Sequence, residues 1–251
     1  MRTILITGAA GNLGAKLRRH LEGRHDLRLL DLHPNGDPTI HAADLSRWDE
    51  TWIRLFEGVN AVVHLAADPV ATRSWPELIA PNVDATINAY EAAARSGVRR
   101  FVYASSNHVM GGYKDEVGPI TPEMPPRPGT HYISGGERRD SSAYAATKLF
   151  GERLGRCYAE SRGLSVVAVR IGWAWRGENR PQDLPPDREE WFRQMWLSNR
   201  DYCQLMERCL TAEMSERFVI LNGMSANTDM RWDITKTRQL LRYEPQDDVF
   251  V

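Results

Sequence analysis

A tyrosine and a lysine four residues apart, Tyr144 and Lys148, are the residues whose types and spacing best fit catalysis. If the stretch through Glu152 is helical, both side chains lie on one face. A lysine ammonium beside a phenol stabilises the phenolate, and a tyrosine with a pKa of about 10 needs a drop of roughly three units to act as a base near neutrality. The same spacing also occurs by chance, with a surface tyrosine lying over a lysine stem. The elements that position the pair must decide between these interpretations.

A glycine-rich turn near the amino terminus is the first such element. The run Thr3 to Thr7 is typical of a buried strand, and Gly8, Gly11 and Gly14 follow it at intervals of three before a helical pattern. The first glycine permits a tight turn, the second lets the backbone approach a pyrophosphate, and the third lets the helix pack closely on the sheet. The free N–H groups at the helix start then favour phosphate. Alone, the pattern also fits an ordinary strand–helix turn.

The second strand carries a carboxylate at its end. Leu27 to Leu30 precedes Asp31, at the position where an acid meets an adenosine ribose. An acid there accepts hydrogen bonds from both ribose hydroxyls and repels a 2′-phosphate, so we expect NAD rather than NADP. A helix-capping aspartate is the alternative. A third strand is expected over 40–45, with Asp44 where the adenine would lie.

Strands and helices alternate along the chain. Further strands are expected at 61–67, 100–104 and 166–171, and helices at 82–94 and 143–161. This alternation predicts an α/β fold with a Rossmann-like, doubly wound parallel sheet, in which ligands bind at the carboxyl ends of the strands. Gly8, Asp31, Ala67 and Ser106 all follow strands, so one cleft can collect them. The apolar stripe of the helix at 82–94 is predicted to be Val83, Ile87, Tyr90 and Ala94.

Two regions follow from this pattern. Residues 1–172 are expected to form the NAD-binding domain, and residues 173–251 a small carboxyl-terminal lobe that meets the substrate. In the lobe we expect a loop over the cleft at 176–188, one helix at 189–210, a strand at 217–222 and a final helix at 233–241. The strand and the final helix should pack back on the core. The Trp and Met residues of 189–210 read as packing rather than as a cofactor site.

Composition excludes several functional classes. Hydrophobic residues make up 42%, charged residues 26% and the net charge is -1, which indicates a globular protein without a nucleic-acid or membrane partner. The three cysteines form no CxxC pair, so we expect reduced, buried thiols in a cytoplasmic protein. The seven histidines show no metal-ligand spacing, and His64 is expected to be a hydrogen-bonded core residue. Neither a signal peptide nor a membrane-spanning run is expected.

Together these stretches resemble the extended short-chain dehydrogenase/reductase family, that of the NAD-dependent epimerases and dehydratases. The resemblance covers nearly the whole chain and rests on residues 7–14, Asp31, 64–67 and 104–106 and on the Tyr144–Lys148 pair. Within that family, residues 104–108 and 169–172 resemble NAD-dependent hexuronate dehydrogenases. Residues 195–201 and 243–247 resemble archaeal NAD-dependent glucose-6-phosphate dehydrogenases. Both groups oxidise the anomeric carbon of a sugar to a lactone.

The resemblance implies a role for each matched residue. Tyr144 would be the catalytic base, Lys148 its partner and a ribose ligand, and Ser106 would hold the reacting hydroxyl. The substrate contacts implied are Asp68, Ser106, Asn107, His108, Tyr144 and Trp173. The cofactor contacts implied are Gly8, Gly11, Asn12, Leu13, Gly14, Asp31, Leu32, Asp44, Leu45, Leu65, Ala66, Ala67, Asn82, Ala104, Ser105, Tyr144, Lys148 and Ile171.

Departures from the hexuronate pattern leave the substrate open. Pro69 and Trp173 stand where that pattern has serines. The arginine that grips a uronate carboxylate has no counterpart in register, although Arg188 and Arg193 are nearby. The stretch 129–142 is longer than either group of relatives requires. It is expected to be a surface loop or, in the alternative, a lid whose Arg138 or Arg139 meets an anionic substrate.

The leading hypothesis is an NAD-dependent sugar dehydrogenase that oxidises the anomeric carbon of a hexuronate, aldose or sugar phosphate to a lactone. Relatives that bind nucleotide sugars usually carry a larger carboxyl-terminal lobe than residues 173–251, which favours a free sugar or sugar phosphate. One alternative is a sugar epimerase or dehydratase that keeps its NAD. Another is a regulator that binds NAD without chemistry. A homo-oligomer, with contacts through 82–96 and 143–161, is expected by analogy.

Overall fold

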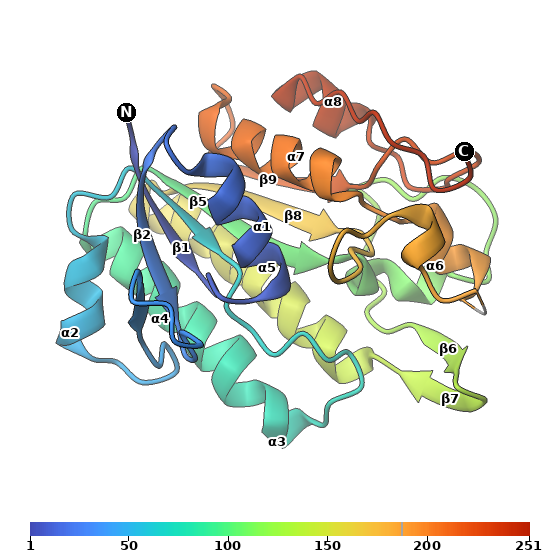
Figure 1. Cartoon of the computed structure of the whole chain (residues 1–251), viewed down its shortest axis with the longest axis horizontal. Coiled ribbons are helices and arrows are strands. Elements are labelled where there is room, and N and C mark those ends of the chain that lie inside the picture. Colours follow the sequence, from blue (N-terminus) through green and yellow to red (C-terminus); the bar gives the residue numbers. More distant parts are fainter. Residues whose placement is uncertain (187) are drawn as a thin grey trace.

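The computed structural model describes residues 1–186 and 188–251. A seven-stranded sheet with the order β3-β2-β1-β4-β5-β8-β9 forms the centre of the molecule, and every pairing within it is parallel. Helices cover both faces of the sheet (Figure 1). The expected Rossmann-like, doubly wound α/β fold is therefore confirmed. The strands of the sheet are β1 (Thr3–Thr7), β2 (Asp26–Asp31), β3 (Ile40–Ala42), β4 (Ala61–His64), β5 (Arg100–Ser106), β8 (Ser165–Ile171) and β9 (Phe218–Gly223).

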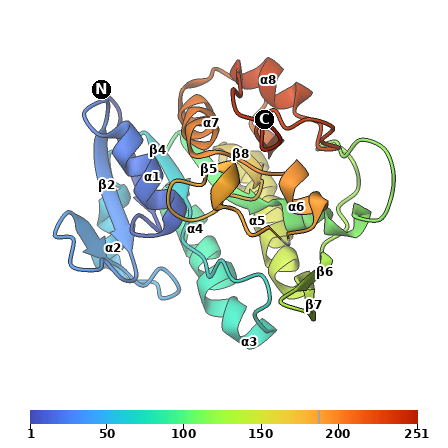
Figure 2. The ribbon, with the colours of Figure 1, turned by 45° about the vertical axis from the view of Figure 1, so that its right-hand side comes forward.

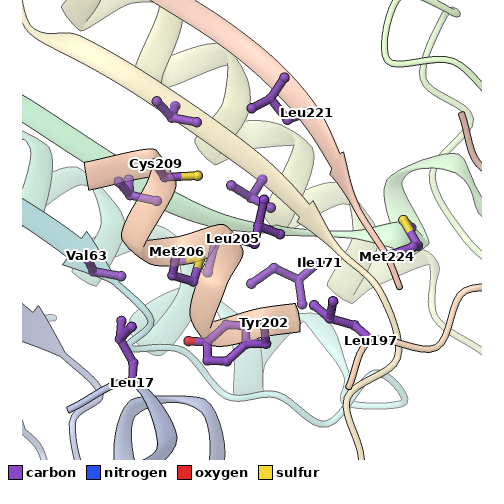
Figure 3. Packing of buried hydrophobic residues seen from close by; sticks show 14 of the residues in the cluster. Leu17, Val63, Ile171, Leu197, Tyr202, Leu205, Met206, Cys209, Leu221 and Met224 are labelled. Atoms are coloured by element: carbon purple, nitrogen blue, oxygen red, sulfur yellow. The ribbon is translucent and has the colours of Figure 1, made fainter. Parts of the chain in front are cut away.

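Two hydrophobic cores, one on each face, hold the helices to the sheet. The first includes residues of α1, α6, α7 and α8, and the second residues of α2, α4 and α5. Figure 3 shows Leu205, Met206 and Cys209 of α7 packed beside Ile171 and Leu221 of the sheet. The helices are α1 (Asn12–Leu21), α2 (Glu50–Ile53), α3 (Trp75–Leu78), α4 (Ala85–Arg95), α5 (Ser142–Arg162), α6 (Glu190–Gln194), α7 (Asn199–Thr211) and α8 (Thr235–Leu241). The 3₁₀ segments are η1 (Arg54–Phe56), η3 (Asn107–Tyr113) and η4 (Pro181–Asp183), and η2 (Ile79–Asp84) is π-helical.

The helix expected over 82–94 is built differently from its prediction. It begins with the π-helical turn η2 and continues as α4. Ile87 is exposed, and Val83 and Ala94 are only partly buried. The buried face consists mainly of Ala85, Ala89, Tyr90, Ala92 and Ala93, with the large Tyr90 ring packed against α5 beside Tyr158. The predicted stripe was therefore wrong except at Tyr90.

The single helix expected over 189–210 is two helices. Trp173 pairs with Trp196 in an isolated bridge. The Trp173 N–H donates to the Met195 carbonyl at 2.9 Å, and the Leu197 N–H donates to the Trp173 carbonyl at 3.0 Å. This pairing ends α6, and the Ser198 side chain then caps α7 by accepting from the Asp201 N–H at 3.0 Å. The expected core residues Trp191, Met195, Leu205, Met206 and Cys209 are all buried.

The stretch 129–142, expected as a loop, contains an antiparallel hairpin of β6 (His131–Ser134) and β7 (Glu137–Asp140). Its two-residue tip is Gly135-Gly136, both with positive φ (60° and 76°), the backbone that two-residue hairpin turns favour. The hairpin projects from one end of the molecule, below α6 in Figures 1 and 2. It leads directly into α5.

The expectations for His64 and for the three cysteines can be compared with the structure directly. His64 is a buried core residue, hydrogen-bonded to the hydroxyls of Thr7 at 2.8 Å and Thr86 at 3.3 Å, as predicted. All three cysteines are free thiols, but Cys157 is exposed rather than buried. The loop expected over 176–188 includes residue 187, which lies outside the described residues. Within the described part of the chain, no helix combines the length and the apolar character needed to cross a bilayer.

Candidate active site

The carboxyl ends of the central strands border a cavity of about 210 Å³. Segments that follow β1, β4, β5 and β8 meet there with the start of α5, as the position of strand ends in such sheets requires. The expected site residues that line this cavity are Leu13, Leu65, Ala67, Ala104, Ser105, Ser106, Asn107, His108, Tyr144, Lys148, Ile171 and Trp173. Four further residues line the cavity and were not among the predicted site residues: Pro69, Ala71, Gly172 and Ala174. Each lies within three residues of a predicted position.

Tyr144 and Lys148 lie in the first two turns of α5, and both face the cavity. The Lys148 Nζ lies 5.8 Å from the Tyr144 ring centroid and donates to the Ala104 carbonyl at 3.1 Å. Ser106, the last residue of β5, lines the same cavity, and its Oγ accepts from the His108 N–H at 3.2 Å. The helix and the strand end thus bring a phenol, a hydroxyl and an ammonium to one wall.

The protein alone does not lower the pKa of Tyr144. Burial raises this pKa to about 12 and the Asp68 carboxylate raises it further, while the hydrogen bond with Ser106 acts to lower it. Burial also lowers the pKa of Lys148 to about 8, which leaves the side chain mainly an ammonium at neutral pH. The expectation that Lys148 makes Tyr144 a base therefore needs a further positive charge in the cleft.

Asn107 and His108 present polar groups beside the Tyr144–Ser106 pair. Asn107 donates to the Ile171 carbonyl at 3.0 Å, and its buried Oδ1 has no partner among the described residues. Burial lowers the pKa of His108 to about 4, so its ring is neutral near pH 7. Its Nδ1 lies 2.9 Å from the Thr130 hydroxyl and 2.8 Å from the Ser141 hydroxyl. The pair can therefore meet hydroxyl groups of a ligand.

The glycine-rich turn packs more closely than side chains would allow, as the turn of a dinucleotide site requires. A Cβ at Gly14 would lie 2.1 Å from the Gly8 carbonyl oxygen, and a Cβ at Gly8 would lie 2.8 Å from the Ala66 nitrogen. Gly8 also has a φ of 70°. Asp31, at the end of β2, accepts from the Ala10 N–H at 2.9 Å, so its carboxylate stands beside this turn. The turn and the carboxylate together have the arrangement that NAD requires.

The remaining expected cofactor residues lie outside the cavity lining. Leu32 is exposed beside Asp31, whereas Leu45 is buried. Asp44 accepts from the Ser46 hydroxyl at 2.6 Å. Asn82 is buried and donates to the Thr147 hydroxyl at 3.2 Å, which ties η2 to α5. Gly8, Gly11, Asn12, Gly14, Asp31 and Ala66 belong to the turn and its neighbours. Ser105, by contrast, lines the cavity, although its hydroxyl donates to the buried Glu152 at 2.6 Å.

Asp68 is the expected substrate residue that the structure does not bring into the cavity lining. One carboxylate oxygen accepts from the Val70 N–H at 2.8 Å, and the other lies 3.2 Å from the Arg73 guanidinium. These local bonds keep the side chain within its own loop. Its backbone N–H donates to Asn82 at 2.8 Å.

Aromatic rings and a cation form the end of the site toward α6. Trp173 and Phe192 lie 6.2 Å apart between ring centroids, and the Arg188 guanidinium lies over both rings, at 5.2 Å and 5.1 Å from their centroids. Tyr132 of the hairpin packs on Phe192 at 5.0 Å and on His108 at 6.4 Å. Arg193, the other arginine noted nearby, lies against Phe250 instead.

Comparison with known proteins places the chain in a family. The model of the NAD dependent epimerase/dehydratase family matches residues 4–184, so the chain belongs to this family. The expectations of this family, of an NAD-dependent enzyme and of NAD as its cofactor are therefore confirmed.

Individual relatives span most of the chain. NAD-dependent glucose-6-phosphate dehydrogenase of Haloferax volcanii is 37% identical over 98% of this chain and 93% of its own length. L-arabinose 1-dehydrogenase (NAD(P)(+)) of the same organism is 33% identical over 99% of this chain and 98% of its own. A structure of uronate dehydrogenase from Agrobacterium tumefaciens complexed with NAD is 29% identical, with a TM-score of 0.80 over 100% of this chain and 86% of that one.

Proposed function

We propose that this protein is an NAD-dependent dehydrogenase that oxidises the anomeric carbon of a sugar to a lactone. The observation that carries the proposal is that Tyr144, Ser106 and Lys148 line one cavity at the carboxyl ends of the central strands. A base next to a hydroxyl donor is what removal of a proton from an alcohol requires. The relatives named above act on a sugar phosphate, a neutral pentose and a uronate, which supports a sugar as substrate.

Each residue has one task in the proposed reaction. Tyr144 as phenolate takes the proton of the anomeric hydroxyl, while the Ser106 hydroxyl donates to the same oxygen and holds it. Lys148, mainly an ammonium at neutral pH, favours the phenolate. When bound, NAD accepts the hydride and adds a positive charge to the cleft. Asn107 and His108 bind the remaining sugar hydroxyls, with neutral His108 able to donate or to accept.

We also propose that residues 173–251 act as the substrate lobe. Trp173 and Ala174 line the cavity, and α6 carries Phe192 to its aromatic end. The cavity of about 210 Å³ fits a free sugar or a sugar phosphate better than a nucleotide sugar. Which of these sugars is used depends on a few side chains at the aromatic end.

A panel of sugars tests the proposal. The protein is incubated with NAD and with aldoses, hexuronates and hexose 6-phosphates side by side, and NADH is followed by its absorbance. Turnover of at least one sugar is expected, with a lactone as the first product. No turnover with any member would count against a dehydrogenase. NAD that copurifies with the protein without net release of NADH would point instead to an epimerase or dehydratase.

A further inference from the structure

The β6–β7 hairpin is fixed at its base to a residue of the site. Thr130 and Ser141, which flank the hairpin, are both fully buried. The Thr130 N–H donates to the Ser141 Oγ at 2.8 Å, and the Ser141 N–H donates to the Thr130 carbonyl at 3.2 Å. Both hydroxyls also contact the Nδ1 of His108, whose ring stands edge-on to Tyr144 at 5.8 Å. The position of the hairpin is therefore coupled to the catalytic wall.

The arm of the hairpin, by contrast, is held mainly through one carboxylate. Glu189 Oε1 accepts from the Ile133 N–H at 2.8 Å, and Glu189 Oε2 pairs with the Lys114 Nζ. Lys114 also donates to the His131 carbonyl at 2.8 Å. The Lys114 and Glu189 side chains are only 18% and 27% exposed, so water screens this pair less than an ordinary surface pair. We call the Lys114–Glu189 pair and its two bonds to β6 the latch.

Without the latch, little else would keep the arm in place. A two-stranded hairpin is marginally stable in water on its own. Ile133 is exposed, and the glycine tip of this hairpin would meet no neighbouring atom within 4 Å if either glycine carried a Cβ. Tyr132 is the arm's large contact with the site, through Phe192 and His108. The latch therefore sets the position of Tyr132 against Phe192 and against His108, which lines the cavity.

The geometry points to Glu189 as a positioning residue for the substrate: by latching β6 to Lys114, it holds Tyr132 in place as the outer wall of the sugar site. The carboxylate touches neither substrate nor cofactor in this role. Its effect reaches the site through Tyr132, which limits how far a ligand can extend beyond His108 and Phe192. Among the described residues, no hydrogen bond or ion pair joins the latch to the cofactor side of the cleft, which is built on β1 and β2.

Substitution of Glu189 tests whether the latch holds the hairpin in place without affecting the stability of the rest of the protein. In Glu189→Ala, amide hydrogen exchange over residues 131–140 should become at least about tenfold faster, while exchange in α5 and β5 stays unchanged. Glu190→Ala is the matched control, because Glu190 is exposed and bonds only to Gln194 on its own helix. Unchanged exchange over 131–140 in Glu189→Ala would overturn the inference, as would equal acceleration in Glu190→Ala.

The kinetic part rests on the proposed dehydrogenase reaction. With the sugar that the panel identifies, Glu189→Ala should raise the KM for sugar about tenfold and leave the KM for NAD unchanged. Tyr132→Ala should raise the same KM without releasing the hairpin base. Lys114→Met combined with Glu189→Ala should cost less than the sum of the two single changes, because either change alone already removes the ion pair between them. Faster exchange of the hairpin with an unaltered KM for sugar would overturn the role in substrate binding.

The two failures can be told apart. If no sugar is turned over, the proposed function fails, yet the exchange experiment still tests the latch. In that case, Glu189→Ala with wild-type exchange would refute the latch as well. If sugars are turned over and the exchange pattern is that of the wild-type protein, only the latch is refuted.

Discussion

Backbone atoms and small side chains form the side of the cleft next to β1 and β4, whereas large aromatic side chains form the side next to α6. On the first side, Gly8 and Gly14 let backbone pack directly on backbone, and Ala67 lines the cavity with a small side chain. On the second side, Trp173 and Phe192 fill space. The difference separates a cofactor site of fixed shape from a substrate site whose shape depends on side-chain packing.

The two sides also differ in how far apart in sequence their partners are. The glycine turn contacts itself and the neighbouring strand ends, as in the bond from Ala10 to Asp31. The aromatic end joins η3, the hairpin, the segment after β8 and α6. Changes on the first side should therefore alter NAD binding, and changes on the second should alter sugar binding. Tyr144 lies between the two, and its loss should lower catalysis far more than it changes NAD or sugar binding near neutral pH.

Tyr144→Phe should give the largest effect on catalysis. Loss of a positioned base is expected to lower kcat by roughly 10²- to 10⁴-fold, because nothing else in the wall can take the proton. NAD affinity, measured by fluorescence titration, should stay within about threefold of the wild-type value. This combination would also exclude a regulator that binds NAD without chemistry. A variant that keeps wild-type kcat would show that Tyr144 is not the base.

Gly14→Ala should weaken NAD binding on the cofactor side and leave the substrate side unchanged. The added Cβ would lie 2.1 Å from the Gly8 carbonyl oxygen, so α1 has to move away from the turn. We expect a loss of about 1–3 kcal/mol in the free energy of unfolding and weaker NAD binding by at least about tenfold. Urea unfolding and NAD titration measure the two effects.

Gly11→Ala is the graded control for that substitution. Its Cβ would lie 3.2 Å from the same oxygen, so the stability loss should be smaller. Hydrogen exchange over the hairpin should be unchanged in both variants. A Gly14→Ala protein with wild-type stability and NAD affinity would contradict the close packing of α1 on the turn.

The same division explains which parts could be predicted from the sequence. The glycine spacing, the strand runs and the Tyr144–Lys148 spacing are local patterns, and each one corresponds to an element found in the structure. The hairpin, in contrast, is not marked by a local sequence pattern of this kind. Its second strand reads Glu137-Arg138-Arg139-Asp140, which has low strand propensity, and its latch residue lies 56 positions from Ile133.

Two other errors have related physical causes. The break between α6 and α7 depends on the pairing of Trp196 with Trp173, a long-range contact that helical periodicity does not contain. The buried face of α4 consists largely of alanine, and alanines do not mark a face as large apolar residues do. Asp68 stays a predicted substrate contact; Arg73, five residues further on, donates to its carboxylate at 3.2 Å.

Arg188→Gln tests the substrate side. The rings of Trp173 and Phe192 lie against the guanidinium, and no ion pair of Arg188 with a described carboxylate is found, so a carboxylate or phosphate of the sugar could bind its N–H groups. For an anionic sugar the KM should rise about tenfold to a hundredfold, while the KM for a neutral aldose stays nearly constant.

Arg193→Gln is the matched control for this substitution. It removes the same charge from α6, but its guanidinium lies against Phe250 rather than over the aromatic end. Its KM values should stay close to those of the wild-type protein. Equal losses for anionic and neutral sugars in Arg188→Gln would mean that Arg188 packs the wall and does not recognise charge.

The pH dependence of NAD binding links the two sides through Tyr144. Burial raises the pKa of Tyr144 to about 12 in the protein alone, and a cationic cofactor in the cleft should lower it. Binding then releases a proton, so NAD affinity should rise with pH by up to about tenfold per unit. The window from pH 6 to 7 is suitable because Lys148, with a pKa of about 8, stays largely charged there. Calorimetric titrations should show this slope in the wild-type protein, and an equal slope in Tyr144→Phe would assign it to another group.

The arginines of the hairpin should give the smallest effects. Arg138 lies opposite the exposed Ile133 in the strand pairing, on the face away from Tyr132, whereas Arg139 lies opposite Tyr132 but pairs with Glu137 at 2.7 Å. Arg138→Gln should therefore leave the KM of an anionic sugar unchanged, and Arg139→Gln should raise it by no more than about threefold, as expected for loss of an exposed pair. Deletion of residues 131–139 should raise the KM far more, because it removes Tyr132 together with both arginines. If Arg139→Gln alone reproduces the effect of the deletion, the hairpin acts by its charge, and the aromatic wall is not what distinguishes the substrate side from the cofactor side.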